Sequence, residues 1–355
     1  MEIKDFMDVI NKLAENGNEK LLKEIMGSVS PVSKNMPGYD LLIKAQNIIN
    51  YDGMNSDVYY DKPYLVTTRN QRYINKTLPE GASSACIILS AADTLFELIS
   101  RDVKNIVALD INELQTLIYK LRRASILTLS AKDFENFLIN PNSSKFMSID
   151  VFKTVKNGFD QHDLEGVNVW EQLLSINPKE DLEKHFFKGI GGDVGKTVYS
   201  LPYLKRKVTY YELRDKLEKA KITIKLQSAL DYLTENSEQK FDYIDITNIL
   251  LFVYQLECKD NQNEFYKRIK TLKDIYRNNL NNGGTFVLDY LFGMHIEDLN
   301  NSPMSDQTSE YIRQIYQLTY QKLNDYFDLE SINAEKLIDG FGPKSDTVIF
   351  TKKPR

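Results

Sequence analysis

One carboxylate in this sequence stands where many α/β proteins bind the ribose of a nucleotide. Asp110 ends the apolar run Ile106–Leu109, roughly 20 residues after the small-residue loop Ser90–Ala92. In the folds that show this spacing, the carboxylate accepts hydrogen bonds from the ribose hydroxyls. The pattern therefore predicts a bound ligand that contains adenosine.

The loop that precedes this carboxylate narrows the class of ligand. Folds that bind dinucleotides use G-x-G-x-x-G, because glycines let the backbone approach the pyrophosphate. The loop Ser90–Asp93 reads SAAD and has no glycine. A cofactor without a pyrophosphate, such as S-adenosylmethionine, makes less demand on this loop. The alternative is a buried turn that binds no ligand.

A strand, loop and helix, followed by a second strand and helix, must position these residues. Thr94 and Glu97 have the T-x-x-E spacing of a capping box, which predicts a helix start directly after the loop. Asn112 and Gln115 form the equivalent pair for the next helix. Because Asn112 and Gln115 can cap this helix, Asp110 is not needed as a cap and is available to bind a ligand.

Later segments add strands to the same sheet. They are apolar or alternating runs at Ile222–Leu226, Phe241–Thr247, Thr285–Leu291, Phe327–Ile332 and Thr347–Thr351. Ser228 and Asp231 predict a capped helix after the first of these runs, and Gly283-Gly284 predict the end of a helix over 263–280. Strands that alternate with helices favour an α/β, Rossmann-like sheet that is mostly parallel, with an antiparallel edge strand.

Helical segments extend and interrupt this α/β pattern. Residues 1–80 form an N-terminal extension, with helices over 3–50 followed by a polar, tyrosine-rich stretch. Residues 81–355 form the α/β domain, whose strand pattern stops for a helical insertion at about 130–220. The aromatic content of the stretch before residue 80 is typical of a functional segment rather than a plain linker.

Two further groups of residues follow later strands. Gln227–Ala229 follow the third strand, where a polar side chain and a backbone N–H commonly meet adenine. Asp245, Thr247 and Asn248 end the fourth strand, at the edge where open α/β sheets bind ligands. In a central strand Asp245 requires a partner, such as a ligand amino group or a cluster of backbone N–H groups. The amide of Asn248 is suited to hold a substrate nucleophile by a hydrogen bond.

The composition excludes several classes of protein and site. The net charge of −5 gives no electrostatic case for binding nucleic acid. We expect Arg122 and Arg123 to reach solvent or to pair with acidic groups on the surface. No apolar run is long enough to cross a membrane, and the first residues lack the basic-then-apolar order of a cleavable signal, so we expect a cytoplasmic protein. His162, His185 and His295 have no metal-binding spacing with the cysteines.

A glycine-rich stretch, residues 189–197, matches a phosphate-binding P-loop only in part. The pattern G-x-x-x-x-G-K-[ST] needs a glycine where this sequence has Ile190. The residues before the stretch look helical rather than extended, which also argues against a nucleotide triphosphatase. We expect a loop of the helical insertion that gates the pocket.

The loop and the carboxylate together resemble part of a known family. The run ILSAADTLFELISRDVKNIVALDINELQTLIYKL is similar to the cofactor-binding region of the S-adenosylmethionine:diacylglycerol 3-amino-3-carboxypropyltransferases of betaine-lipid synthesis. Ser90, Ala92, Asp93, Asp110 and Asn112 match its motif, although alanines stand where the family usually has glycine. FDYIDITNIL, GGTFVLDY and NQRYI are similar to the family's catalytic-edge strand, its next strand and its substrate-facing stretch. The resemblance covers roughly residues 55–295 and implies a class I methyltransferase-like fold that binds S-adenosylmethionine.

The resemblance and the strand positions together give a set of candidate site residues. The candidate cofactor-binding residues are Ser90, Ala91, Ala92, Asp93, Thr94, Asp110, Ile111, Gln115, Gln227, Ser228 and Ala229. The candidate substrate-binding residues are Tyr59, Tyr60, Arg72 and Tyr73. The candidate catalytic residues are Asp245, Thr247 and Asn248, and no metal site is expected.

Three functions follow from these observations. The first is transfer of the 3-amino-3-carboxypropyl group of S-adenosylmethionine to a small-molecule, peptide or lipid acceptor. The second is methylation of a small molecule by the same cofactor. The third is a non-catalytic, methyltransferase-like scaffold whose helical insertion binds a protein. The acceptor and the oligomeric state stay open at this point.

Overall fold

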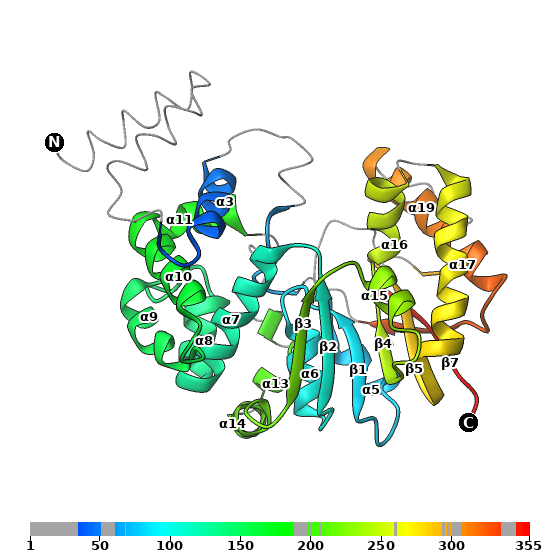
Figure 1. The fold of residues 1–355 in the computed structure, drawn as a ribbon, viewed down its shortest axis with the longest axis horizontal. Coiled ribbons are helices and arrows are strands. Elements are labelled where there is room, and N and C mark those ends of the chain that lie inside the picture. The colour runs from blue at the N-terminus through cyan, green and yellow to red at the C-terminus, as the bar shows by residue number, and fades with distance from the viewer. Residues whose placement is uncertain are drawn as a thin grey trace.

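A single β-sheet forms the centre of the molecule (Figure 1). The computed structural model describes residues 35–50, 61–67, 69–187, 197–198, 200–205, 207–258, 261–292, 295–296, 299, 307–334 and 346–355. The strands in these ranges are β1 (Ser84–Ile88), β2 (Asn105–Asp110), β3 (Lys221–Leu226), β4 (Phe241–Asp245), β5 (Leu280–Leu291), β6 (Glu330–Ala334) and β7 (Asp346–Lys352). Their order across the sheet is β3-β2-β1-β4-β5-β7-β6.

The strand directions follow the prediction from the alternation of helices and strands. Neighbouring strands from β3 to β5 are parallel, whereas β7 runs antiparallel to both β5 and β6. Parallel neighbours need a crossover connection, and the helices between the strands supply it. The prediction of a mostly parallel α/β sheet with an antiparallel edge is therefore confirmed.

Alternating side chains divide the core into two layers. In β1, Ala85 and Ile87 belong to one core cluster and Cys86 to another, because successive side chains of a strand point to opposite faces. The first layer includes α6 (Asp93–Ser100), α7 (Glu113–Thr128), α13 (Pro202–Lys205) and α14 (Lys207–Leu217). The second includes α15 (Ala229–Glu235), α16 (Ile249–Phe252), the π-helix η4 (Val253–Glu257), α17 (Gln262–Asn279) and α19 (Gln307–Asn324). Helices thus cover both faces of the sheet (Figure 1).

A group of helices lies beside α7, away from the strands (Figure 1). It contains α8 (Ala131–Leu138), α9 (Ile149–Val155), η2 (Lys156–Gly158), α10 (Leu164–Ile176), α11 (Lys179–Asp181), η3 (Leu182–Phe186) and, from the N-terminal side, α3 (Tyr39–Ile49). Trp170 anchors the group: it is fully buried and its Nε1 donates to the Leu117 carbonyl of α7 at 3.0 Å. Phe186 and Phe187 pack around this indole, so these aromatic residues belong to the core.

The glycine pair after α17 does not end that helix, contrary to the prediction. α17 ends at Asn279, and Leu280 already belongs to β5. Gly283 has a φ of +77°, which favours glycine, and its N–H donates to the Lys353 carbonyl at 2.9 Å. A Cβ at Gly284 would lie 2.9 Å from the Asp242 carbonyl oxygen. Glycine is therefore favoured at position 283 by the positive φ and at position 284 by the close approach of the neighbouring backbone.

Several expectations concern parts of the chain outside the described residues. These are the helices predicted before residue 35, the residues Tyr59 and Tyr60, and the glycine-rich stretch up to residue 196. In the ranges that the structure describes, no helix combines the length and apolar character needed to span a membrane.

Candidate functional site

A cavity of about 210 Å³ lies at the carboxyl edge of the sheet, against the ends of four strands. Its lining includes Ser90 after β1, Asp110 at the end of β2, Gln227 after β3 and Thr247 after β4. The order of the strands reverses between β1 and β4, and open α/β sheets bind ligands in the crevice outside such a reversal. The cavity is therefore the candidate site.

Backbone N–H groups hold the Asp110 carboxylate at the edge of this cavity. Its Oδ2 accepts the N–H of Ser90 at 3.1 Å, and its Oδ1 accepts the N–H of Asn112 at 2.9 Å. Asn112 in turn caps α7, as predicted, because its side chain accepts the N–H of Leu114. The two predicted cofactor segments, after β1 and after β2, are thus joined through one carboxylate.

Two residues that line the cavity have a strained backbone. Ser90 has a φ of 43° and Asn248 a φ of 67°, and both lie directly beyond the strands that flank the reversal. A left-handed conformation of a residue other than glycine costs on the order of 1–3 kcal/mol and is concentrated at functional sites. The strain is a second, independent reason to place function at this cavity.

The residues expected near adenine also line the cavity. Gln227, Ser228 and Ala229 lie on one side of it, and Ile111 lies at its rim with 68% of its surface exposed. The Gln227 amide donates to Glu235 Oε2 at 2.7 Å. Ser228 stands at the N-cap position of α15 without a side-chain capping bond, so the predicted capping box with Asp231 is wrong.

Asp93 does not reach the cavity, which corrects its expected role. Its side chain is fully buried, forms an ion pair with Arg122 and accepts hydrogen bonds from the Tyr203 hydroxyl at 2.6 Å and the Thr67 N–H at 2.8 Å. Arg122 is fully buried as well, so the prediction that it reaches solvent is wrong. Arg122 lies one helical turn after Ile118, on the apolar face of α7, so its side chain points toward the core.

Thr94 and Glu97 are buried in α6 and do not form the predicted capping box. The helix begins after Ala92, which has a φ of 63° and whose methyl side chain offers no capping acceptor. Thr94 Oγ1 donates to Gln71 Oε1 at 3.0 Å, and Glu97 pairs with Arg101 at 2.6 Å. Burial raises the pKa of Glu97 to about 7, although Arg101 opposes the change. Ala91 and Ala92 are buried too, so of the loop after β1 only Ser90 lines the cavity.

Asp245 is buried behind the cavity and has protein partners. It accepts the Tyr73 hydroxyl at 2.5 Å and the Thr247 hydroxyl at 2.8 Å, and Arg69 Nη1 lies 3.5 Å from its Oδ1. The expectation that it needs a partner is confirmed, but these partners replace the predicted ligand amine or N–H cluster. Burial and the adjacent carboxylate raise the pKa of Tyr73. Of the three candidate catalytic residues, Thr247 and Asn248 line the cavity.

The candidate substrate residues that are described lie away from the cavity lining. Tyr73 is buried against Asp245, and Arg72 lies in the short helix η1 (Gln71–Tyr73) that leads into α5 (Ile74–Thr77). Neither belongs to the lining of the cavity. Tyr73 therefore supports the site from behind and is not placed to touch a substrate.

The segment before η1 contributes cavity residues that the sequence analysis missed. Lys62, Tyr64, Thr67 and Arg69 all line the cavity. The N–H of Tyr64 donates to Gln115 Oε1 at 2.9 Å, and Gln115 Nε2 donates to the Tyr64 carbonyl at 2.8 Å. Gln115 therefore holds this segment rather than capping α7. Partial burial lowers the pKa of Lys62. The segment has no helical or strand periodicity, and its aromatic content was the only signal of its importance.

The second missed contribution is the helical turn after β4. Phe252 of α16 and Val253 and Glu257 of η4 line the cavity on the side of the second layer. A π-helix departs from the usual helical period and is often found at functional sites. The apolar residues of α16 and η4 form too short a run for their pattern to be distinguished from the end of a strand.

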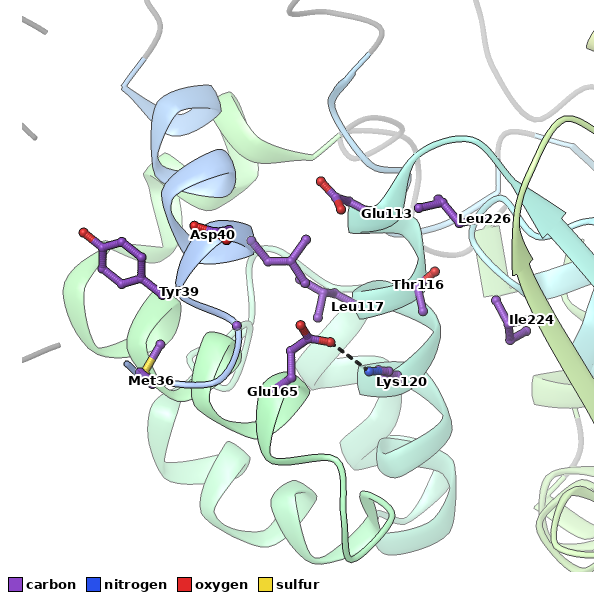
Figure 2. Close-up of a pocket in the computed structure, with 12 residues that line it drawn as sticks. Met36, Tyr39, Asp40, Glu113, Thr116, Leu117, Lys120, Glu165, Ile224 and Leu226 are labelled. Carbon is purple, nitrogen blue, oxygen red and sulfur yellow. Dashed lines mark ion pairs between the residues drawn. The ribbon is translucent and has the colours of Figure 1, made fainter. Parts of the chain in front are cut away.

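A larger cavity, of about 570 Å³, lies between the helical group and the edge strand β3 (Figure 2). Its lining combines apolar side chains, Leu117, Ile224 and Leu226, with charged ones. Among the charged residues, Lys120 Nζ lies 3.7 Å from Glu165 Oε2. None of the candidate site residues lines it. The smaller cavity is therefore the better candidate for the functional site, because the residues at the strand ends line it.

No protein-family model matches the chain, and no curated protein matches it either. Within the described part of the chain, no group of histidine, cysteine and acidic side chains has the arrangement of a metal site.

Proposed function

We propose that the protein is a transferase that uses S-adenosylmethionine. The observation that carries the proposal is the position of Asp110: it lines a cavity at the strand reversal, beside Ser90 and next to Gln227, whose N–H donates to the Asp110 carbonyl at 2.9 Å. A carboxylate in this position is suited to accept both hydroxyls of a ribose. Gln227–Ala229 would then lie near the adenine.

The topology of the sheet supports a class I methyltransferase-like fold. The resemblance in sequence implied such a fold, and the strand pattern predicted parallel strands with an antiparallel strand at the edge. β7 is antiparallel to both of its neighbours, β5 and the edge strand β6. The absence of glycine in the loop after β1 further favours a cofactor without a pyrophosphate.

The reaction that we propose is transfer of the 3-amino-3-carboxypropyl group to an acceptor nucleophile. The sulfonium activates three adjacent carbons, and the enzyme selects one by presenting it in line with the acceptor. The nucleophile forms a bond to that carbon, the carbon–sulfur bond breaks with its electron pair on sulfur, and methylthioadenosine leaves as a neutral thioether while the acceptor's proton passes to solvent. Thr247 and Asn248 line the cavity and would face the reacting atoms. Asp245 is a positioning residue, since it holds Thr247 and Arg69 from behind.

Binding of S-adenosylmethionine tests the cofactor assignment. In isothermal titration calorimetry, we expect Asp110→Ala to weaken binding by about 1–3 kcal/mol, because the ribose hydroxyls lose a buried acceptor. Asp150→Asn is the matched control, since Asp150 is an exposed acid of α9. Failure of the wild-type protein to bind the cofactor would refute the proposal and favour the scaffold function.

The products identify the transferred group. We expect methylthioadenosine when the protein is incubated with S-adenosylmethionine and a cell extract, as measured by mass spectrometry. S-adenosylhomocysteine in its place would show that the protein is a methyltransferase.

A further inference from the structure

Two residues of the cavity each keep a buried polar atom without a hydrogen bond. These atoms are Arg69 Nη1 and Asn248 Oδ1. Both residues line the cavity, and Arg69 is only 6% exposed. A buried polar group without a hydrogen bond is costly and therefore rare in folded proteins. A ligand in the cavity would supply the missing partners.

The protein holds the Arg69 guanidinium in place through its neighbours. Its Nη2 donates to Thr94 Oγ1 at 3.4 Å, and its Nη1 lies 3.5 Å from Asp245 Oδ1, too far for a good hydrogen bond. The backbone N–H of Arg69 also donates to Thr67 Oγ1 at 3.1 Å. A guanidinium fixed in this way is suited to bind a carboxylate, which it recognises by geometry as well as by charge.

The Asn248 amide is fixed by the backbone that carries it. Its φ of 67° is a strained conformation, and its backbone N–H is bonded to the buried Asp289 carboxylate. Asn248 is joined to Arg69 through Asp245, which accepts hydrogen bonds from Thr247, the neighbour of Asn248. A cationic donor and a neutral acceptor in the cavity lining are thus linked through Asp245.

We propose that Arg69 and Asn248 form a subsite for the α-amino-acid group of S-adenosylmethionine. Arg69 would bind the carboxylate, and the Asn248 carbonyl would accept the ammonium group. A phosphate fits less well, because it offers only acceptors to Asn248 Oδ1. This inference rests on the proposed function for the identity of the ligand. In this arrangement the expected cofactor-binding residues Asp93 and Thr94 do not contact the cofactor, since both are buried in other contacts.

Two related ligands separate this subsite from the rest of the cavity. S-adenosylhomocysteine carries the adenosine and the amino-acid group, whereas methylthioadenosine carries the adenosine without it. In isothermal titration calorimetry, we expect Arg69→Gln to weaken S-adenosylhomocysteine about 10- to 100-fold and to change methylthioadenosine by less than about twofold. Asp110→Asn should weaken both ligands alike, because both carry the ribose.

A second variant tests the same subsite without removing a buried charge. Asn248→Gly removes the amide, and glycine adopts the positive φ without strain. We expect it to weaken S-adenosylhomocysteine selectively as well. If Arg69→Gln unfolds, as circular dichroism would reveal, the result with Asn248→Gly decides the proposal.

The outcomes separate the subsite from the proposed function. Equal weakening of both ligands, or of neither, in the folded variants would overturn the subsite and leave the cofactor assignment in place. Failure of the wild-type protein to bind either ligand would overturn the proposed function and the subsite with it.

Discussion

Two acidic residues at neighbouring strand ends, Asp93 and Asp110, have opposite surroundings in this molecule. Asp93 follows β1 and is enclosed by Arg122, Tyr203 and the Thr67 backbone, with no exposed side-chain surface. Asp110 ends β2, is bonded to two backbone N–H groups and lines the candidate cavity. The sequence resemblance assigns both to the cofactor, whereas in the structure only Asp110 lines the cavity and Asp93 is enclosed in a buried ion pair.

The difference between the two carboxylates shows what a buried ion pair does at the edge of this sheet. The Asp93–Arg122 pair joins α6 to α7, and its hydrogen bonds extend to α13 and to the segment that covers the cavity. Such a pair contributes little net stability compared with apolar packing, but removal of one partner leaves a buried charge unpaired. The two acids should therefore respond very differently to substitution.

The largest effect is expected for the stability of the Asp93→Asn variant. Loss of the carboxylate leaves the fully buried Arg122 guanidinium without its counter-charge, at a cost of about 3–5 kcal/mol. Urea denaturation followed by circular dichroism measures this change as a lower midpoint. A loss below about 1 kcal/mol would contradict the assignment of Asp93 to a structural ion pair.

The matched substitution at the other strand end should change binding rather than folding. In Asp110→Asn one carboxylate oxygen is replaced by an amide, and we expect a loss of stability of about 1 kcal/mol or less in the same denaturation experiment. Affinity for S-adenosylmethionine should fall by more than the stability does. A large loss of stability with unchanged affinity would reverse the comparison between the two acids.

A third and smaller effect concerns the pH dependence of stability near Asp93. Burial raises the pKa of Glu97 from 4.5 to about 7, so the folded state binds a proton that the unfolded state releases. Stability from this group is therefore present below about pH 4.5 and is lost as the pH rises toward 7.

Glu97→Gln isolates this contribution. The variant should lose less stability than the wild type between pH 5 and pH 8, by on the order of 1 kcal/mol. Denaturation midpoints at the two pH values measure the difference, and Glu264→Gln, at an exposed position of α17, serves as the control. Parallel pH profiles for Glu97→Gln and the wild type would show that Glu97 is not responsible.

Much of the fold follows from local patterns, whereas part of the site does not. Apolar or alternating runs of strand length predicted β1 to β5 and the two final strands, and burial of central strands such as β1 and β4 leaves a direct mark on composition. The spacing between Ser90 and Asp110 correctly brought two cavity residues together. Helix ends were predicted less well, since Thr94 and Gly283 make other contacts than the expected caps and Ser228 makes no side-chain capping bond.

Periodicity and short spacing were enough to predict the α/β layers, the antiparallel edge and the strand ends that carry polar residues, because these features are local. Folding alone brings Asp93 to Arg122, and Asp245 to Arg69 and Tyr73, and places Lys62, Tyr64, Thr67 and Arg69 in the cavity lining. The physical reason is the distance along the chain: the hydrogen bond from Tyr73 to Asp245 joins residues 172 positions apart. No local pattern specifies which charge will meet which across such a separation.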